Sequence, residues 1–385
     1  NLGISKKSVK SVKVVEAHKP TKESTQGHTH TPGLPLITIL HTGGTIASKV
    51  DYETGGVVAR FSPEELLAQF PELKTIANIE SRLIRNMFSE DMRFAHYNIL
   101  AKEIDKEIKK GAQGIIITHG TDTLHYSSAA LSFMMKPLPI PVILVGAQRS
   151  SDRGSSDAAM NAVCAAVFMT QTQFAGVGVC MHETMNDDTC VILSGTHARK
   201  MHSSRRDAFK SINELPYARV DFAKRTVHVL RDIPHRSDAK PTFTSMDDKL
   251  NIGILFAHPN MHADEIKQYE EYDGLVIAGT GLGHVPVNEI DDETKEHTKI
   301  LKALATLTKK GVPVVMTSQT ISGIVNLDVY ATGRKIQEAG VLGNGIYITP
   351  EVAFIKLAWL LSNHKDHWAE HWPQDIIGEL SKGLP

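Results

Sequence analysis

Short β-branched runs that end in glycine constrain the fold of this chain more than any other feature. Such runs occupy Leu34–Leu40, Gly114–Gly120 and Pro141–Gly146, and continuous apolar runs of this length are typical of buried parallel strands. Helical patterns fill the gaps between them, namely a capping-box start at Ser62, Pro63 and Glu65, an amphipathic stretch at Phe94–Lys110, and an Ala- and Met-rich stretch at Ser156–Thr170. Strand alternating with helix predicts an α/β fold with a doubly wound, mostly parallel sheet.

A second, smaller α/β unit is expected after the polar, proline-bearing stretch at residues 231–249. Its expected elements are strands at Ile252–Phe256, Gly274–Ala278 and Val312–Met316 and a helix at Pro350–Leu361. We therefore predict four parts, which are a strand remnant and linker at 1–33, a large α/β domain at 34–240, a smaller α/β domain at 249–362 and a polar tail at 363–385. A chain of 385 residues has ample length for two packed domains.

The charge balance limits the classes of partner. The 42 basic side chains nearly match the 43 acidic ones, so the chain has no overall field to hold a polyanion, which argues against autonomous binding to nucleic acid or membranes. Its three cysteines are too few for a disulfide framework, and we expect free, buried thiols in a reducing compartment.

The ends of the sequence bear on localisation. No run of about 18 apolar residues occurs, and the start is polar and lysine-rich without the apolar stretch of a secretory signal, so we expect a cytoplasmic protein. The first residue is Asn1 rather than methionine, and residues 1–15 resemble the end of a strand pattern. We interpret this start as the remnant of a domain cut short.

Two threonine-bearing motifs directly follow predicted strands. Residues 42–47 read TGGTIA and residues 119–123 read HGTDT. Paired glycines let the backbone turn tightly and leave amide donors and a hydroxyl facing a ligand. Either motif taken alone also suits an ordinary strand-to-helix turn, in which Asp122 would cap the following helix. In doubly wound sheets, however, ligands bind beyond the carboxyl ends of the strands, which is where both motifs lie.

A lysine completes the set of reactive groups. Lys200 ends the segment GTHARK, and a lysine accepts a proton only where its surroundings lower its pKa; otherwise it is a solvated cation. Threonine hydroxyls, the Asp122 carboxylate and Lys200 together supply a nucleophile, a base and orienting groups for covalent acyl transfer.

The two motifs resemble the signatures of the L-asparaginase superfamily, and the resemblance extends over about residues 34–361. It implies a two-domain asparaginase-like fold and an amidase that releases ammonia from glutamine or asparagine through a threonyl acyl-enzyme. By position in the motifs, Thr45 corresponds to the nucleophile, and Thr121, Asp122 and Lys200 correspond to the second catalytic group. Tyr52 is similar to a mobile tyrosine that follows the first motif.

The resemblance also implies the substrate-binding residues. Ser89 and Glu90, in FSEDM, lie where the family holds the α-amino and α-carboxylate groups of the substrate, although family members often have glutamine at the position of Glu90. Gly44 and Gly120 are expected to bring backbone donors to the substrate and its oxyanion. No metal is expected.

Other segments resemble one family within this superfamily, the D subunits of archaeal glutamyl-tRNA(Gln) amidotransferases. These segments are GAQRSSDRGSSDA at 146–158 and ARKMHSSRRDAFKSIN at 198–213, with Ser150 where free asparaginases usually carry proline. The family pairs an asparaginase-like unit with an N-terminal β-barrel, of which residues 1–33 would be a truncated remnant.

This second resemblance implies a set of partners. The chain would supply ammonia, as a homodimer within a heterotetramer, to an E subunit that binds tRNA(Gln) and uses ATP and Mg²⁺; this chain itself would need no cofactor. The basic residues Arg199, Lys200, Arg205 and Arg206 suit phosphate contact or, alternatively, a solvated helix face.

Several other functions stay open on the sequence alone. A stand-alone cytoplasmic L-asparaginase would use the same chemistry without a partner, and a non-catalytic amino-acid sensor could share the fold. A zinc enzyme is suggested only by pairs such as His28 with His30 and His258 with His262, which lack a recognised ligand spacing. A dinucleotide enzyme is suggested only by GTGLGH at 279–284, which matches poorly and lies late in the chain.

Overall fold

The computed structural model describes residues 30–44, 48–50, 57–59, 70–151 and 154–380. The chain divides into two compact units, Asn1–Gly33 and Leu34–Pro385, and all the elements described below belong to the second. Thr45, Tyr52 and the helix start expected at Ser62 lie outside the described residues.

The larger sheet has eight strands in the order β12-β11-β8-β7-β6-β5-β1-β4. The strands from β7 to β4 are parallel, whereas β8, β11 and β12 extend the sheet in antiparallel fashion. The strands are β1 (Leu36–Gly43), β4 (Asn78–Met87), β5 (Gly114–Thr118), β6 (Pro141–Val145), β7 (Gly176–His182), β8 (Thr189–Ser194), β11 (Ala218–Asp221) and β12 (Thr226–Val229). The expected doubly wound, mostly parallel sheet is therefore confirmed, with an antiparallel edge.

Smaller elements accompany this sheet. Two short hairpins are formed by β2 (Ser48–Val50) with β3 (Val57–Ala59) and by β9 (Ala198–Lys200) with β10 (Phe209–Ser211). The helices of this part are η3 (Pro71–Thr75), η4 (Ser89–Asp91), α2 (Phe94–Lys109), α3 (Leu124–Met134) and α4 (Ala158–Gln171). The helix α2 ends where Gly111, at φ 98°, adopts the left-handed conformation that glycine tolerates best.

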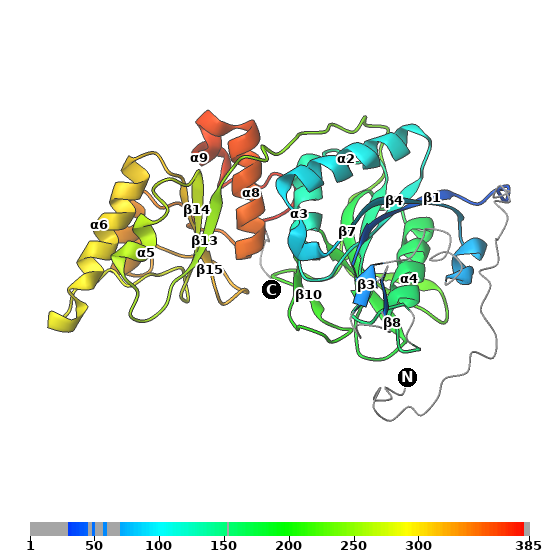
Figure 1. Ribbon diagram of the computed structural model, residues 1–385, viewed down its shortest axis with the longest axis horizontal. Helices are drawn as coiled ribbons and strands as arrows, with labels where there is room; N and C mark the ends of the chain where they lie inside the picture. The colour runs from blue at the N-terminus through cyan, green and yellow to red at the C-terminus, as the bar shows by residue number, and fades with distance from the viewer. Residues whose placement is uncertain (1–29, 45–47, 51–56, 60–69, 152–153, 381–385) are drawn as a thin grey trace, which may run out of the picture. The chain divides into compact units, whose positions relative to one another are not determined.

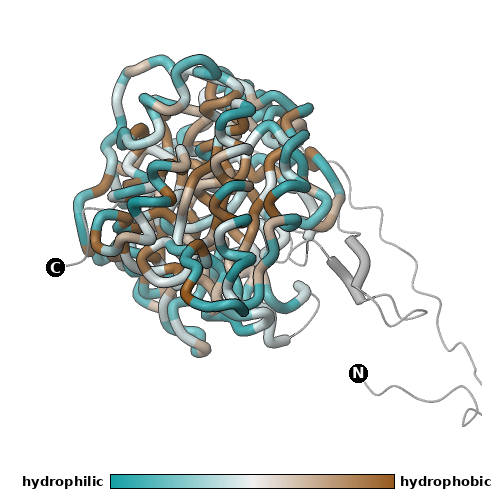
Figure 2. Tube along the Cα trace, turned by 90° about the vertical axis from the view of Figure 1, so that its left-hand side faces the viewer, coloured by the Kyte–Doolittle hydropathy of each residue, from teal (hydrophilic) through white to brown (hydrophobic). Residues whose placement is uncertain are grey.

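The strands alternate their side chains between two cores, which explains why helices cover both faces. Ile115 and Ile117 of β5 join the core beneath α2 and α3, while Ile116 joins the core beneath α4. Full burial of each such side chain stabilises the fold by about 1.5–3 kcal/mol. Figure 2 shows the hydrophobic segments gathered inside the body and hydrophilic segments around it.

The smaller sheet is parallel, in the order β13-β14-β15. Its elements are β13 (Ile252–Phe256), α5 (Ala263–Lys267), β14 (Gly274–Gly279), η5 (Asp292–Thr294), α6 (Glu296–Lys309), β15 (Val314–Ser318), α7 (Ala331–Glu338), α8 (Pro350–Asn363), η6 (Lys365–His367) and α9 (Trp368–His371). The helix α8 packs on this sheet and also on α3 of the larger part, and Figure 1 shows it between the two. The core beneath α2 and α3 therefore continues through α8 to Val276 and Val315 of the smaller sheet.

The start of α8 follows familiar rules for a helix N-terminus. Thr349 is the N-cap and its hydroxyl accepts a hydrogen bond from Val352 N, while Pro350 occupies the first helical position. The glycine-rich segment 279–284 forms a tight turn after β14, closed by a bridge between Thr280 and His284, and does not open a helix as a dinucleotide site requires. None of the described helices is both long and apolar enough to cross a membrane.

Candidate active site at the carboxyl ends of β1 and β5

Close backbone contact brings the two motifs together. A Cβ atom on Gly44 would lie 2.4 Å from the backbone nitrogen of Gly120, so only glycine lets these two turns touch. A Cβ atom on Gly120 would in turn lie 2.9 Å from Cβ of Ser89. Both Gly43 (φ 103°) and Gly44 (φ 77°) have left-handed backbone conformations. The structure thus places Gly44, Gly120 and Ser89 side by side at one edge of the sheet.

Hydrogen bonds hold these turns in register. The hydroxyl of Thr42 donates to the carbonyl of Thr118 (2.9 Å), which links the ends of β1 and β5. The hydroxyl of Thr123 donates to the carbonyl of Ser89 (2.6 Å), which links HGTDT to η4. Ser89 is buried and Glu90 is exposed beside it. Gly44 and Ser89 therefore lie against the second motif, and Glu90 follows Ser89 in η4.

Lys200 reaches the HGTDT motif from β9. Its Nζ donates to Oγ1 of Thr121 (2.9 Å) and to Oδ1 of Asp122 (2.7 Å), although the residues lie far apart in the sequence. The Lys200 side chain is 9% exposed and that of Asp122 is 65% exposed. Asp122 does not cap α3, as the alternative interpretation held, because Thr123 is the N-cap residue and Asp122 faces the lysine. The Thr121 hydroxyl and the Asp122 carboxylate thus both contact the Lys200 side-chain nitrogen.

His119 holds the backbone of the HGTDT motif at Gly120. It is buried, with Nδ1 2.7 Å from the carbonyl of Gly120 and Nε2 2.8 Å from the hydroxyl of Ser127. Burial lowers the pKa of His119 to about 4, despite the opposing hydrogen bond to Gly120. The neutral ring satisfies both contacts if Nδ1–H donates to the carbonyl and Nε2 accepts from Ser127. This pair was not singled out from the sequence, although the histidine belongs to the motif.

An ion pair from α8 supports the strand that carries Lys200. Arg199 donates from Nε (3.0 Å) and Nη2 (2.7 Å) to Oε1 of Glu351, which is buried. Burial raises the pKa of Glu351, but the hydrogen bond and charge of Arg199 outweigh it and leave the pKa below its ordinary value. No local sequence signal could have paired residues 152 positions apart.

The basic run 199–206 is not a helix face, contrary to that alternative. It begins on β9 and continues through a loop. Arg205 pairs with Asp207 (2.8 Å) and Arg206 pairs with Asp187, so these cations already have acidic partners within the chain. Phosphate contact at this run would have to compete with those pairs.

A polar hollow adjoins the candidate site. It has a volume of about 450 Å³, and its walls include Asp122, Lys200, His125, Tyr126 and Glu351. Burial lowers the pKa of His125 to about 4, which keeps its ring neutral near neutral pH. The groups on this wall are positioned by both parts of the chain.

Other candidates from the sequence receive different partners. His258 lies 2.8 Å from Oε2 of Glu265, and no group of three or more His, Cys, Asp or Glu side chains among the described residues is arranged to hold a metal. The three cysteines Cys164, Cys180 and Cys190 are free and buried, as expected.

Comparisons with known proteins identify the family of this chain. Residues 36–235 match the family described as asparaginase, N-terminal, and residues 251–369 match the glutaminase/asparaginase C-terminal domain. The solved L-asparaginase from Thermococcus kodakarensis is 30% identical, with a TM-score of 0.77 over 90% of this chain and 100% of that one.

Two curated relatives are more similar in sequence. The D subunit of glutamyl-tRNA(Gln) amidotransferase from Pyrococcus horikoshii is 44% identical, covering 95% of this chain and 81% of the relative. The D subunit of the same enzyme from Methanococcus maripaludis is 40% identical, covering 100% of this chain and 90% of the relative. The chain therefore belongs to the asparaginase family and, within it, to the D subunits of glutamyl-tRNA(Gln) amidotransferase.

Proposed function

We propose that this chain is the amidase subunit of a tRNA-dependent amidotransferase and releases ammonia from the side-chain amide of glutamine or asparagine. The contact of Lys200 Nζ with both Thr121 Oγ1 (2.9 Å) and Asp122 Oδ1 (2.7 Å) is the observation that carries this proposal. It joins a hydroxyl to a group able to exchange protons and to a carboxylate that orients that group.

The proposed reaction has two halves. In the first, the Thr45 hydroxyl attacks the amide carbon, an acyl–oxygen bond forms, and the carbon–nitrogen bond breaks as the nitrogen takes up a proton and leaves as ammonia. In the second, water attacks the ester and releases the acid with the threonine hydroxyl restored. Thr121, Asp122 and Lys200 move the protons, and backbone N–H groups near Gly44 and Gly120 stabilise the oxyanion.

The roles of the remaining residues belong to the same proposal. Ser89 and Glu90 hold the α-amino and α-carboxylate groups of the substrate, and Tyr52 acts from the segment that follows the first motif. The burial of Ser89 against Gly120 supports a fixed role for Ser89, whereas the exposed carboxylate of Glu90 suits an ammonium group on an arriving substrate.

The proposed assembly follows from the descriptions of the relatives as subunits of an amidotransferase. We propose that two copies of this chain join two E subunits, which bind tRNA(Gln) and use ATP and Mg²⁺. The net charge of −1 is consistent with leaving most of the contact with tRNA to the partner.

A comparison of ammonia release tests this assignment against a stand-alone asparaginase. The purified chain is assayed with glutamine and with asparagine, alone and then with the E subunit and mischarged glutamyl-tRNA(Gln). The proposal predicts that glutamine hydrolysis rises strongly when both are added. Asparagine turnover that is rapid for the isolated chain and unaltered by these additions would identify a stand-alone hydrolase instead.

A further inference from the structure

The loop that follows β6 lies directly against Thr121. A Cβ atom on Gly146 would lie 2.6 Å from Cγ2 of Thr121, so the threonine methyl occupies the space beside the Gly146 backbone. The same Cβ atom would lie 3.2 Å from the carbonyl oxygen of His119. The position of the Gly146 backbone therefore limits where the Thr121 side chain can lie.

Asn161 of α4 and Asp157, the N-cap residue of that helix, hold this loop. Asn161 Nδ2 donates to the carbonyl oxygen of Gly146 (2.9 Å). The carboxylate of Asp157 accepts from the backbone nitrogens of Gln148 (3.0 Å) and Arg149 (3.1 Å). Both side chains are fully buried, at 0% exposure. Buried hydrogen bonds of this kind fix the loop because their loss leaves a polar group without solvent or partner.

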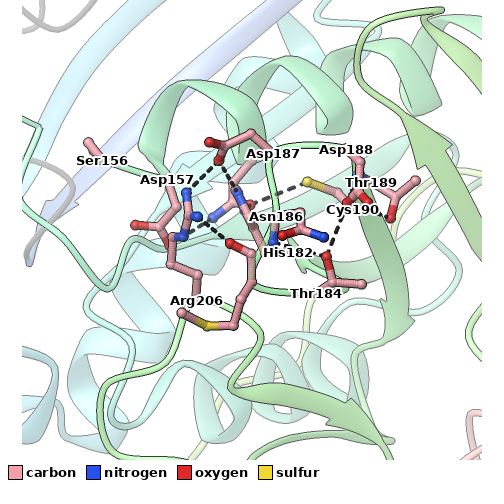
Figure 3. A network of polar contacts seen from close by, with 12 residues as sticks. Ser156, Asp157, His182, Thr184, Asn186, Asp187, Asp188, Thr189, Cys190 and Arg206 are labelled. Carbon is pink, nitrogen blue, oxygen red and sulfur yellow. Dashed lines mark hydrogen bonds and ion pairs between the residues drawn. The ribbon is translucent and has the colours of Figure 1, made fainter. Parts of the chain in front are cut away.

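Asn161 is itself held in one orientation. Its Nδ2 faces the Gly146 carbonyl, so Oδ1 must face His182, whose Nδ1 lies 2.7 Å away and donates to it. Cys190 Sγ approaches the same oxygen at 3.4 Å. The other ring nitrogen of His182 lies 3.3 Å from Oδ1 of Asp187, which pairs with Arg206. Figure 3 shows His182 beside Asp187, with Arg206 reaching the same carboxylate.

We infer that Asn161 is a positioning residue for Thr121, acting through the Gly146 carbonyl and the methyl contact. The inference rests on the proposed function, since it assigns Thr121 a part in proton transfer. Asn161 is fully buried, so its effect on Thr121 is transmitted through the loop. Its amide fixes the Gly146 backbone, and that backbone keeps the Thr121 hydroxyl within reach of Lys200. A displacement of about 1 Å in such a group is able to lower a rate about a hundredfold.

A double-mutant cycle tests this route of action. Asn161→Leu removes the amide while keeping the branched shape of the side chain, and Thr121→Ser removes the methyl while keeping the hydroxyl. We expect Asn161→Leu to lower kcat for ammonia release from glutamine by about tenfold to a hundredfold, with KM changing much less. In the Thr121→Ser background the same change should lower kcat by only about threefold or less, because the methyl contact is already gone.

The controls separate positioning from a general loss of structure. Val163→Ala, also buried on α4, should lower the melting temperature and leave kcat unchanged at a temperature where the protein is folded. If Asn161→Leu does not fold, Asn161→Ser is used in the same cycle. Equal effects of the Asn161 change in both Thr121 backgrounds would overturn the inference.

The outcome also distinguishes this inference from the proposed function. If Lys200→Met and Thr121→Ala both retained full ammonia release, the proposed site itself would be wrong. If both of these variants lost activity, the proposed site would stand. If in addition the effects of Asn161→Leu and Thr121→Ser on kcat were independent of each other, only the positioning role of Asn161 would fail.

Discussion

At the scale of single residues, the candidate site depends on glycines that let two turns touch. Gly44 lies against Gly120, and Gly120 lies against Ser89. A Cβ atom added to either glycine would lie within 3.0 Å of its neighbour, which is too close for two atoms that are not bonded. Gly44 also has φ 77°, a conformation that costs an L-residue about 1–2 kcal/mol. Two separate physical demands therefore require glycine at position 44.

Replacing Gly44 by alanine should destabilise the protein more than the same change at Gly111. Gly111 has φ 98° but nothing within 4 Å of its Cβ position, so Gly111→Ala measures backbone strain alone. We expect the free energy of unfolding to fall by about 1–2 kcal/mol for Gly111→Ala and by about 1–3 kcal/mol more for Gly44→Ala. Urea denaturation measures both, and equal losses would show that the Gly44–Gly120 contact adds nothing.

The sequence located much of the site because the motif residues share one edge of a parallel sheet. The motif that carries Thr121 and Asp122 follows β5 directly, and Lys200 contacts both residues. The Glu351 partner of Arg199 could not be predicted, because it depends on how α8 packs in three dimensions. The placement of Thr45 and Tyr52 stays a prediction, since both lie outside the described residues.

At the scale of elements, β9 is the strand on which the proposed chemistry depends. It has only three residues, Ala198–Lys200, and pairs with the equally short β10. So short a hairpin is marginal by itself. The ion pair between Arg199 and Glu351 attaches it to the first turn of α8, a helix whose buried residues belong to the same hydrophobic core as Ala198 of β9.

Glu351→Gln should therefore loosen the attachment of β9. The change leaves the Arg199 charge without its anionic partner, and we expect the free energy of unfolding at pH 7 to fall by about 1–3 kcal/mol. The exposed residue Glu338 on α7 supplies the matched control, Glu338→Gln, which should change stability by less than about 0.5 kcal/mol.

The pH dependence of this loss has a definite sign. The pKa of Glu351 in the folded protein is lower than its ordinary value of 4.5. The ion pair therefore stabilises the fold fully above pH 4.5, and this contribution is lost as the pH falls through the lower pKa of the folded protein. The difference between wild type and Glu351→Gln should shrink below about pH 4.5. A difference that grew on acidification would contradict the assignment.

Elements were predicted best where apolar runs are continuous. β13 was predicted at its observed bounds, and β5, β6 and α2 within two residues, because full burial leaves an unbroken pattern. The antiparallel edge strands β8, β11 and β12 were not predicted, since β11 and β12 are short and partly polar. The helix face that the sequence left open for the basic run at Arg199–Arg206 is not formed, because Arg199 and Lys200 lie on a strand that pairs with β10.

At the scale of the whole molecule, the carboxyl-terminal segment joins the two parts. Lys356 of α8 donates to Oε1 of Glu379 (2.6 Å), and both side chains are fully buried. One residue earlier, the Gly378 carbonyl lies 3.0 Å from Nε2 of His197, near the strand that carries Lys200. A stretch that reads as a polar tail is thus fixed against both parts of the chain.

Removing one member of this buried pair should strongly destabilise the protein. Glu379→Gln leaves the Lys356 charge buried without an anion, and we expect a loss of about 3 kcal/mol in the free energy of unfolding. Lys356→Met combined with Glu379→Gln should recover at least half of that loss. Thermal and urea denaturation measure the stability of the single and the double variant. If Glu379→Gln alone did not lower the free energy of unfolding, Lys356 and Glu379 would not form a buried ion pair in solution.

The central claim of this account is that Lys200 serves the amidase chemistry rather than only the fold. The direct measurement is the rate of ammonia release from glutamine, with the partner present, by Lys200→Met and by Lys210→Met. Lys210 lies on the paired strand β10 and contacts Asp207 at 3.6 Å, away from Thr121, so it is the matched control. The account predicts that Lys200→Met lowers kcat by about 10²–10⁴-fold while Lys210→Met stays within about twofold of wild type. Equal activity of the two folded variants would contradict it.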